Sequence, residues 1–182
     1  MKLTERQLDR AIYSLWDFQQ ALSALTFLLE DYDFEKRYSK VELRRFRCYE
    51  TTLIISMARP FEQSRNSTTL SLRAIEIPLD GFEKELVSSI TGLRQKIIAH
   101  SDEEEMHFRS GTFPVLDGTI NFPKLRFDET LHLKQEELIQ LEALLRKLLQ
   151  GIGQFVFKLA QDEPSVLERY KHPKLLARKD RV

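Results

Sequence analysis

The sequence predicts an all-α fold, a bundle of four main helices with a small inserted β-hairpin. Apolar residues recur at helical spacing in four long segments, and only six Gly and six Pro interrupt the 182 residues. The segment 106–133 instead alternates apolar and polar residues, as a β-hairpin does. A chain of this length forms one ordinary domain. We therefore expect a single helical domain over residues 1–162 and a loosely held tail, with a short helix, over 163–182.

Two capping-box signals mark the starts of the first two helices. Thr4 is followed three residues later by Gln7, and Ser39 by Glu42, so that the two side chains of each pair can bind backbone N–H groups at a helix start. The second helix is expected to end or kink at Pro60. The first carries one apolar stripe, made of Leu8, Ile12, Leu15, Leu22, Leu25 and Leu29.

The third and fourth helices flank the predicted hairpin. The third begins near Asp80-Gly81, and its apolar stripe, which includes Ile90 and Ile97, continues by one step to His100. The fourth has the most regular stripe, and its two glycines, Gly151 and Gly153, are expected to weaken its last turns slightly. Its stripe consists of Leu138, Leu141, Leu145, Leu148, Ile152, Phe155 and Leu159.

The segment 106–133 contains a turn signal, Asp117-Gly118, between two alternating stretches. We expect the Phe-rich hairpin to cover one end of the bundle, although an exposed apolar face there would suit a partner. Residues 66–80 are expected to form a loop with a short extended piece.

Composition and charge exclude several classes of protein. Lys and Arg together number 28, as do Asp and Glu, so no long-range field would gather nucleic acid or anionic lipid. A single cysteine, Cys48, cannot form an internal disulfide. The sequence has no signal-like start and no apolar run long enough to span a bilayer. We expect a cytoplasmic protein that does not contact membranes.

The four His residues lack metal-binding spacing, and the phosphate-loop, dinucleotide and hydrolase motifs are missing from the sequence. No metal and no cofactor is therefore expected. We expect His107, His132 and His172 to lie at the surface.

Chemistry-bearing side chains gather at the end of the third helix. An imidazole can take or give a proton near neutral pH, and a guanidinium can bind phosphate oxygens and stabilise developing charge. Metal-free cleavage of RNA needs both groups. On a regular helix Arg94 and His100 lie about 120° apart, a constraint that a site between two protomers would relax. The segment reads Leu93-Arg94-Gln95-Lys96-Ile97-Ile98-Ala99-His100-Ser101-Asp102.

A purely structural interpretation explains the same residues. His100 could be a core histidine at the helix end, satisfied by backbone carbonyls or by Asp102. Arg94, Gln95 and Lys96 would then be solvated surface, and the third helix would serve only the core.

This segment resembles the signature of the HEPN superfamily, an Arg followed by four to six residues and a His at a helix end in an α-helical bundle. It is most similar to a bacterial branch that reads Arg-x-Lys-x-x-Ala-His-Ser-Asp, found among abortive-infection and toxin-like proteins. The stretch Ile55-Ser56-Met57-Ala58-Arg59-Pro60-Phe61 also resembles that branch.

The resemblance implies a homodimer whose motifs meet in a cleft, and a metal-independent endoribonuclease that leaves a cyclic phosphate. Arg94 would contact the phosphate and His100 would act as acid or base. Gln95, Lys96, Ser101 and Asp102 would support them, and we infer from proximity that Asp102 orients His100.

Gln95 departs from the family pattern, since many active members carry Asn, Asp or His directly after the Arg. The resemblance also allows a non-catalytic HEPN-like dimer that binds a nucleotide or a partner protein, such as an antitoxin or a nucleotidyltransferase.

Basic residues on and after the second helix are candidate RNA contacts. Arg44, Arg47 and Arg59 could follow an RNA backbone toward the cleft. The alternative is a solvated face offset by neighbouring acids, which the zero net charge favours.

Overall fold

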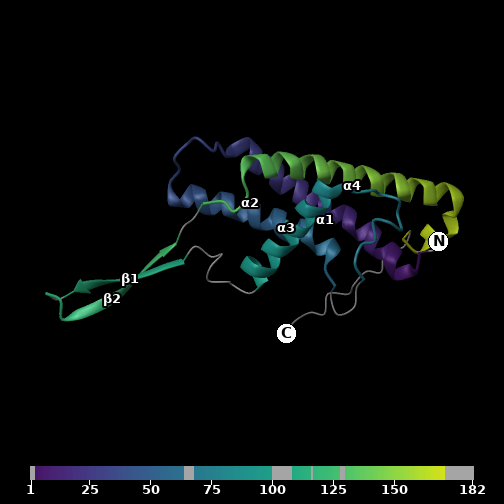
Figure 1. The fold of residues 1–182 in the computed structure, drawn as a ribbon. Coiled ribbons are helices and arrows are strands. Elements are labelled where there is room, and N and C mark those ends of the chain that lie inside the picture. The colour runs from purple at the N-terminus through teal and green to yellow at the C-terminus, as the bar shows by residue number, and fades with distance from the viewer. Residues whose placement is uncertain (1–2, 64–67, 100–107, 116, 128–129, 171–182) are drawn as a thin grey trace, which may run out of the picture.

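The computed structural model describes residues 3–63, 68–99, 108–115, 117–127 and 130–170, and they form a helical bundle with an inserted antiparallel β-hairpin (Figure 1). This confirms the expected fold class. The helices are α1 (Glu5–Asp31), α2 (Lys40–Ala58), α3 (Gly81–Leu93) and α4 (Gln135–Asp162), the short helical turns are η1 (Arg59–Phe61), η2 (Arg94–Ala99) and η3 (Pro164–Tyr170), and the strands are β1 (Phe108–Val115) and β2 (Ile120–Phe127).

The predicted helix starts are confirmed. Thr4 and Ser39 each form a capping box with the glutamine or glutamate three residues later. Asp80 does the same for α3, since its carboxylate accepts a hydrogen bond from the backbone N–H of Glu83 at 2.8 Å. Pro60 lies in η1, where α2 has ended.

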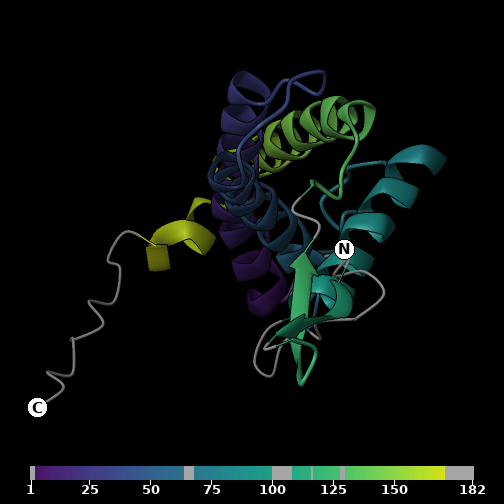
Figure 2. The ribbon, with the colours of Figure 1, turned by 90° about the vertical axis from the view of Figure 1, so that its left-hand side faces the viewer.

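Helix α1 packs against both α2 and α4, and α3 packs against α2. Helices α1, α2 and α4 run roughly along the length of the molecule, and α3 crosses them (Figures 1 and 2). The core lies between these helices. Its largest fully buried side chains are Phe18, Leu25, Leu28, Phe46, Leu53, Ile54, Met57, Ile90, Leu138, Leu141, Leu144 and Leu145.

The buried face of α1 is rotated from the predicted stripe. Leu8 and Leu25 are buried as expected, but Leu15 and Leu22 are only partly buried. The buried face is centred on alanines, because their small side chains let the neighbouring helices approach α1 closely. Leu15 and Leu22 of the predicted stripe therefore lie toward the edge of that face. The buried residues of α1 are Leu8, Ala11, Ser14, Asp17, Phe18, Ala21, Ala24, Leu25 and Leu28.

The segment before α3 forms a turn over residues 72–76 in place of the expected extended piece. Its backbone folds back on itself, with the N–H of Ile77 donating to the carbonyl of Leu72 at 2.9 Å. The turn buries Ile75 and Ile77 against the bundle.

The hairpin has the predicted strands and turn. Val115 pairs with Ile120, and Asp117 and Gly118 in the connection have φ of 51° and 86°, the left-handed values that such turn residues favour. The hairpin does not cover the bundle end as expected; it projects away from the helices (Figures 1 and 2). Alternation specifies strand pairing and an apolar face, but it does not specify what packs on that face.

The short helix predicted within the tail is confirmed as η3, and the Tyr170 hydroxyl at its end donates a hydrogen bond to the carboxylate of Asp9. Residues 171–182 of the predicted tail, and His107, lie outside the described residues. Among the helices that the structure describes, none combines the length and the hydropathy needed to cross a bilayer.

Candidate functional site

Arg94 lies where the third helix changes its winding. Helix α3 ends at Leu93, and residues 94–99 continue as a π-helical turn. The backbone N–H of Arg94 donates to the carbonyls of both Ile90 and Thr91. Short π-helical turns are rare in proteins, and many of those that do occur lie at functional sites.

Glu62, just after η1, holds the side chain of Arg94. Nη1 of Arg94 lies 2.7 Å from Oε2 of Glu62, and the two side chains are 37% and 14% exposed. Nε2 of Gln95 donates to the other carboxylate oxygen of Glu62 at 3.5 Å. One carboxylate thus engages the first two polar residues of the motif. Glu62 was not among the predicted residues, because no local spacing connects it to a motif distant in the sequence.

Most of the remaining predicted site residues follow Ala99 in the sequence. Lys96 is exposed on η2, whereas His100, Ser101 and Asp102 lie outside the described residues. The pairing of Arg94 with His100 stays a prediction. Over the described ranges, His, Cys, Asp and Glu side chains form no group of three or more that could hold a metal ion.

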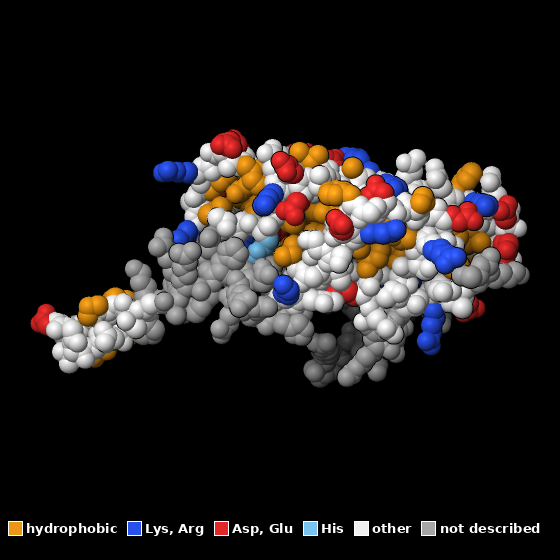
Figure 3. Space-filling model, viewed as in Figure 1, with side chains coloured by type: hydrophobic (Ala, Val, Ile, Leu, Met, Phe, Trp, Pro, Cys, Tyr) orange, Lys and Arg blue, Asp and Glu red, His pale blue; other side chains and the backbone are white. Residues whose placement is uncertain are grey.

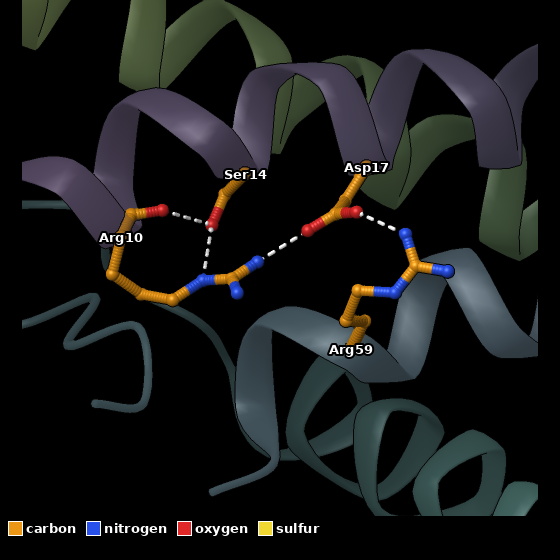
Figure 4. A network of polar contacts seen from close by, with 4 residues as sticks. All are labelled: Arg10, Ser14, Asp17 and Arg59. Carbon is orange, nitrogen blue, oxygen red and sulfur yellow. Dashed lines mark hydrogen bonds and ion pairs between the residues drawn. The ribbon is translucent and has the colours of Figure 1, made fainter. Parts of the chain in front are cut away.

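Arg59, a predicted RNA contact, belongs to a polar network between α1 and η1 (Figure 4). Its Nη1 lies 2.7 Å from Oδ1 of Asp17, and the guanidinium of Arg10 binds the other oxygen of Asp17. Nε of Arg10 donates to the Ser14 hydroxyl at 3.3 Å, and that hydroxyl donates to the backbone carbonyl of Arg10 at 2.6 Å. Two guanidiniums therefore share one carboxylate.

Arg10 and Arg59 differ in how far they are exposed to solvent, and this difference indicates different roles. The side chains of Asp17 and Arg10 are only 6% and 10% exposed, so their ion pair is shielded from water. Arg59 is 50% exposed, and a guanidinium has five N–H donors, so Arg59 keeps donors for an anion from solution. The sequence analysis did not identify Asp17. The available signal was that Ser14 and Asp17 are polar residues at positions that the alanines of the same helix face mark as buried.

The turn η1 links the two ion pairs. Arg59 at its start contacts α1 through Asp17, and Glu62 just after its end contacts η2 through Arg94. Both arginines are partly exposed, and each has one carboxylate partner. This arrangement fixes two guanidiniums in place while leaving part of each open to a phosphate or carboxylate.

Comparison with known proteins gives no relative. No family model, curated protein or solved structure matches the chain. The residues of the site are therefore the basis for a functional conclusion.

The other predicted RNA contacts lie on α2. Arg44 is exposed. Nη1 of Arg47 donates to the backbone carbonyl of Thr130 at 2.8 Å, which ties α2 to the segment that leads into α4. The structure thus gives Arg47 a structural role, and an RNA contact there stays a prediction.

A buried acid on α2, Glu50, also holds the segment that leads into α4. Its Oε1 accepts hydrogen bonds from the backbone N–H groups of His132 and Leu133 at 2.7 and 2.8 Å. Burial raises the pKa of Glu50 to about 7. His132 is half-buried and not at the surface as expected, because this attachment draws its backbone toward α2.

Proposed function

We propose that the protein is a metal-independent endoribonuclease of the HEPN type, from a defence or toxin system, and that RNA is cleaved in a cleft between two copies by Arg94 and His100. The observation that supports this proposal is the position of Arg94. It stands at an α-to-π transition at the end of a bundle helix, partly exposed and held by Glu62.

The chemistry follows from the two side chains. A neutral imidazole of His100 takes the proton of a ribose 2′-hydroxyl, and the oxygen attacks the adjacent phosphorus. The bond from phosphorus to the 5′-oxygen breaks, and a protonated imidazole, supplied by the second copy, gives that oxygen a proton. The products are a 2′,3′-cyclic phosphate and a free 5′-hydroxyl. Arg94 stabilises the charge that develops on the phosphate oxygens.

Glu62 acts in this scheme as a positioning residue. It engages Nη1 of Arg94 and so limits the directions that the guanidinium can take, while the remaining N–H donors stay available for phosphate oxygens. A preorganised donor needs less rearrangement when the transition state forms.

The alternative is a non-catalytic HEPN-like dimer that binds a nucleotide or a partner protein, such as an antitoxin or a nucleotidyltransferase. One observation favours it: the carboxylate of Glu62 offsets the charge of Arg94 and also accepts a hydrogen bond from Gln95. Both side chains are thereby drawn toward a protein carboxylate, which competes with a substrate phosphate.

The test is RNA cleavage in the presence of a chelator. Single-stranded RNA is incubated with the wild-type protein, with Arg94→Ala and with His100→Ala. Arg146→Ala and His172→Ala are the matched controls, and Arg146 is also an ion-paired arginine, 2.7 Å from Glu142. We expect cleavage with cyclic-phosphate ends, seen by mass spectrometry. The motif variants should lose at least about a hundredfold in rate while the controls keep it.

Circular dichroism of each variant separates a loss of chemistry from a loss of structure. If the wild-type protein cuts no RNA but binds nucleotides in a manner that needs Arg94, the non-catalytic alternative replaces the nuclease. If His100→Ala instead lowers the melting temperature and neither activity nor binding is found, the histidine belongs to the core and both proposals are wrong.

A further inference from the structure

An open groove of about 580 Å³ runs between α1 and α2. Trp16 and Phe27 lie along it with 62% and 51% of their surface exposed, and the Phe27 ring packs 5.7 Å from that of Tyr49. Polar residues along the groove include Gln20 and Thr52, and none of the lining residues carries a charge. A nucleic acid backbone requires cations, so this groove suits an uncharged, apolar protein surface.

The outer end of the hairpin carries a second apolar surface. Phe113 pairs with Phe122, and Val115 with Ile120, so these four side chains share one face of the two-stranded sheet. The two Phe rings lie 6.0 Å apart. Phe113, Ile120 and Phe122 are 42%, 47% and 55% exposed. Figure 3 shows apolar side chains on this projecting part of the molecule.

The exposed hairpin face needs a cover. A two-stranded hairpin alone is at best marginally stable in water and normally packs its apolar face against another element. None of the described helices covers this face, since three of its four side chains remain exposed. The hairpin also points away from its own bundle (Figure 1). The cover must come from outside the described part of the chain.

We propose that the apolar face of the hairpin docks into the α1–α2 groove of a second copy of this chain. The groove and the outer end of the hairpin are both rich in exposed aromatic side chains, and the hairpin projects while the groove is hollowed. Polar side chains such as Gln20 and Thr52 can form hydrogen bonds with the unpaired backbone groups at the edge of a docked strand. The exchange is reciprocal, so a dimer with twofold symmetry forms the same contact twice. This contact does not depend on the proposed nuclease activity.

The native Cys48 allows a direct test by disulfide formation. It is exposed on α2, next to Tyr49 and one helical turn before Thr52. One chain keeps Cys48, and a differently tagged second chain carries Cys48→Ser with Thr119→Cys in the hairpin turn. A disulfide that joins the two chains can then arise only between the groove of one copy and the hairpin of another. We expect this mixed disulfide under mild oxidation.

Matched substitutions separate docking from random collision. Trp16→Glu in the first chain, or Phe122→Glu in the second, should lower the yield of the mixed disulfide by at least about tenfold. Phe157→Glu, which changes an equally exposed aromatic residue on α4 at 66% exposure, should leave it unchanged. Circular dichroism confirms that the variants fold.

The proposal is overturned if no mixed disulfide forms, or if Phe157→Glu lowers its yield as much as Trp16→Glu does. It is also overturned if only the groove variant matters, because another protein surface would then occupy the groove. These outcomes are independent of RNA cleavage, so failure of this contact is distinguishable from failure of the nuclease proposal.

Discussion

Nη1 of Arg94 lies 2.7 Å from Oε2 of Glu62, and this ion pair joins the π-helical turn after α3 to the turn after α2. Both side chains keep contact with water. On the proposed function, Glu62 would control how much of the charge of Arg94 acts on a bound phosphate.

Substitution of Glu62 by Gln is expected to strengthen RNA binding. On the proposed function, the substitution removes a negative charge beside the phosphate site and frees Arg94 to neutralise one more phosphate. The slope of log affinity against log salt should steepen by about 0.7 for single-stranded RNA. Fluorescence anisotropy with a labelled oligonucleotide measures both quantities. Glu142→Gln, the partner of Arg146 on α4, is the control. Equal slopes for Glu62→Gln and the wild-type protein would show that Glu62 does not reduce the charge that Arg94 presents to RNA.

The two arginines that share Asp17 are expected to differ in their contribution to stability. Asp17→Ala leaves the guanidinium of Arg10 shielded from water without its partner, which should cost about 3 kcal/mol or more. Arg59→Ala removes a half-exposed guanidinium and leaves the pair of Arg10 and Asp17 intact, so its cost should be about 1 kcal/mol or less. Urea unfolding of the two variants measures both losses in the free energy of unfolding. Equal losses would contradict the shielding of the pair of Arg10 and Asp17.

The buried Glu50 is expected to make stability depend on pH. Burial, assisted by the charge of Glu137, raises its pKa from 4.5 to about 7, although Arg47 and the N–H groups of Leu133 and His132 oppose the rise. The folded protein thus binds this proton more tightly than the unfolded chain. The free energy of unfolding should fall by about 3 kcal/mol as the pH rises through the interval between these two pKa values, and then level off.

Glu50→Gln tests this contribution, because an amide does not titrate. The fall in unfolding free energy between the two pKa values should be missing from Glu50→Gln and present in the control Glu142→Gln. Urea unfolding at a series of pH values gives the slopes directly. A Glu50→Gln variant with the wild-type slope would assign the pH dependence to other groups.

The two glycines of α4 are expected to respond oppositely to alanine. A methyl group at Gly151 would lie 2.6 Å from Cδ1 of Ile77, whereas one at Gly153 meets nothing within 4 Å. Gly153→Ala should stabilise the helix by about 0.5–1 kcal/mol. Gly151→Ala should be destabilising, since overpacking costs about 1–3 kcal/mol.

Thermal unfolding of the two variants measures the difference, and Ile77→Ala provides the control. In the Ile77→Ala background the clash is removed, so Gly151→Ala should become neutral or stabilising. If Gly151→Ala behaves like Gly153→Ala with Ile77 present, the close approach of α4 to Ile77 is not maintained in solution.

Local signals were sufficient for the four main helices and the hairpin. The capping boxes at Thr4 and Ser39 fixed helix starts because each uses side chains only three residues apart. Asp117-Gly118 located the hairpin turn for the same reason, since left-handed backbone angles favour these residue types. The site was only half accessible to such reasoning. The motif drew attention to Arg94, but its partner Glu62 comes from a different part of the chain.

The sequence by itself determined where the helices and the hairpin form, because capping, turn chemistry and apolar periodicity act over a few residues. The tertiary structure alone decided the partners: Asp17 for Arg10 and Arg59, Glu62 for Arg94, and the backbone of Leu133 for Glu50. It also decided that Gly151 faces Ile77 while Gly153 faces open space. These relationships depend on how distant segments pack, and the free energy of that packing is shared among contacts that no local spacing encodes.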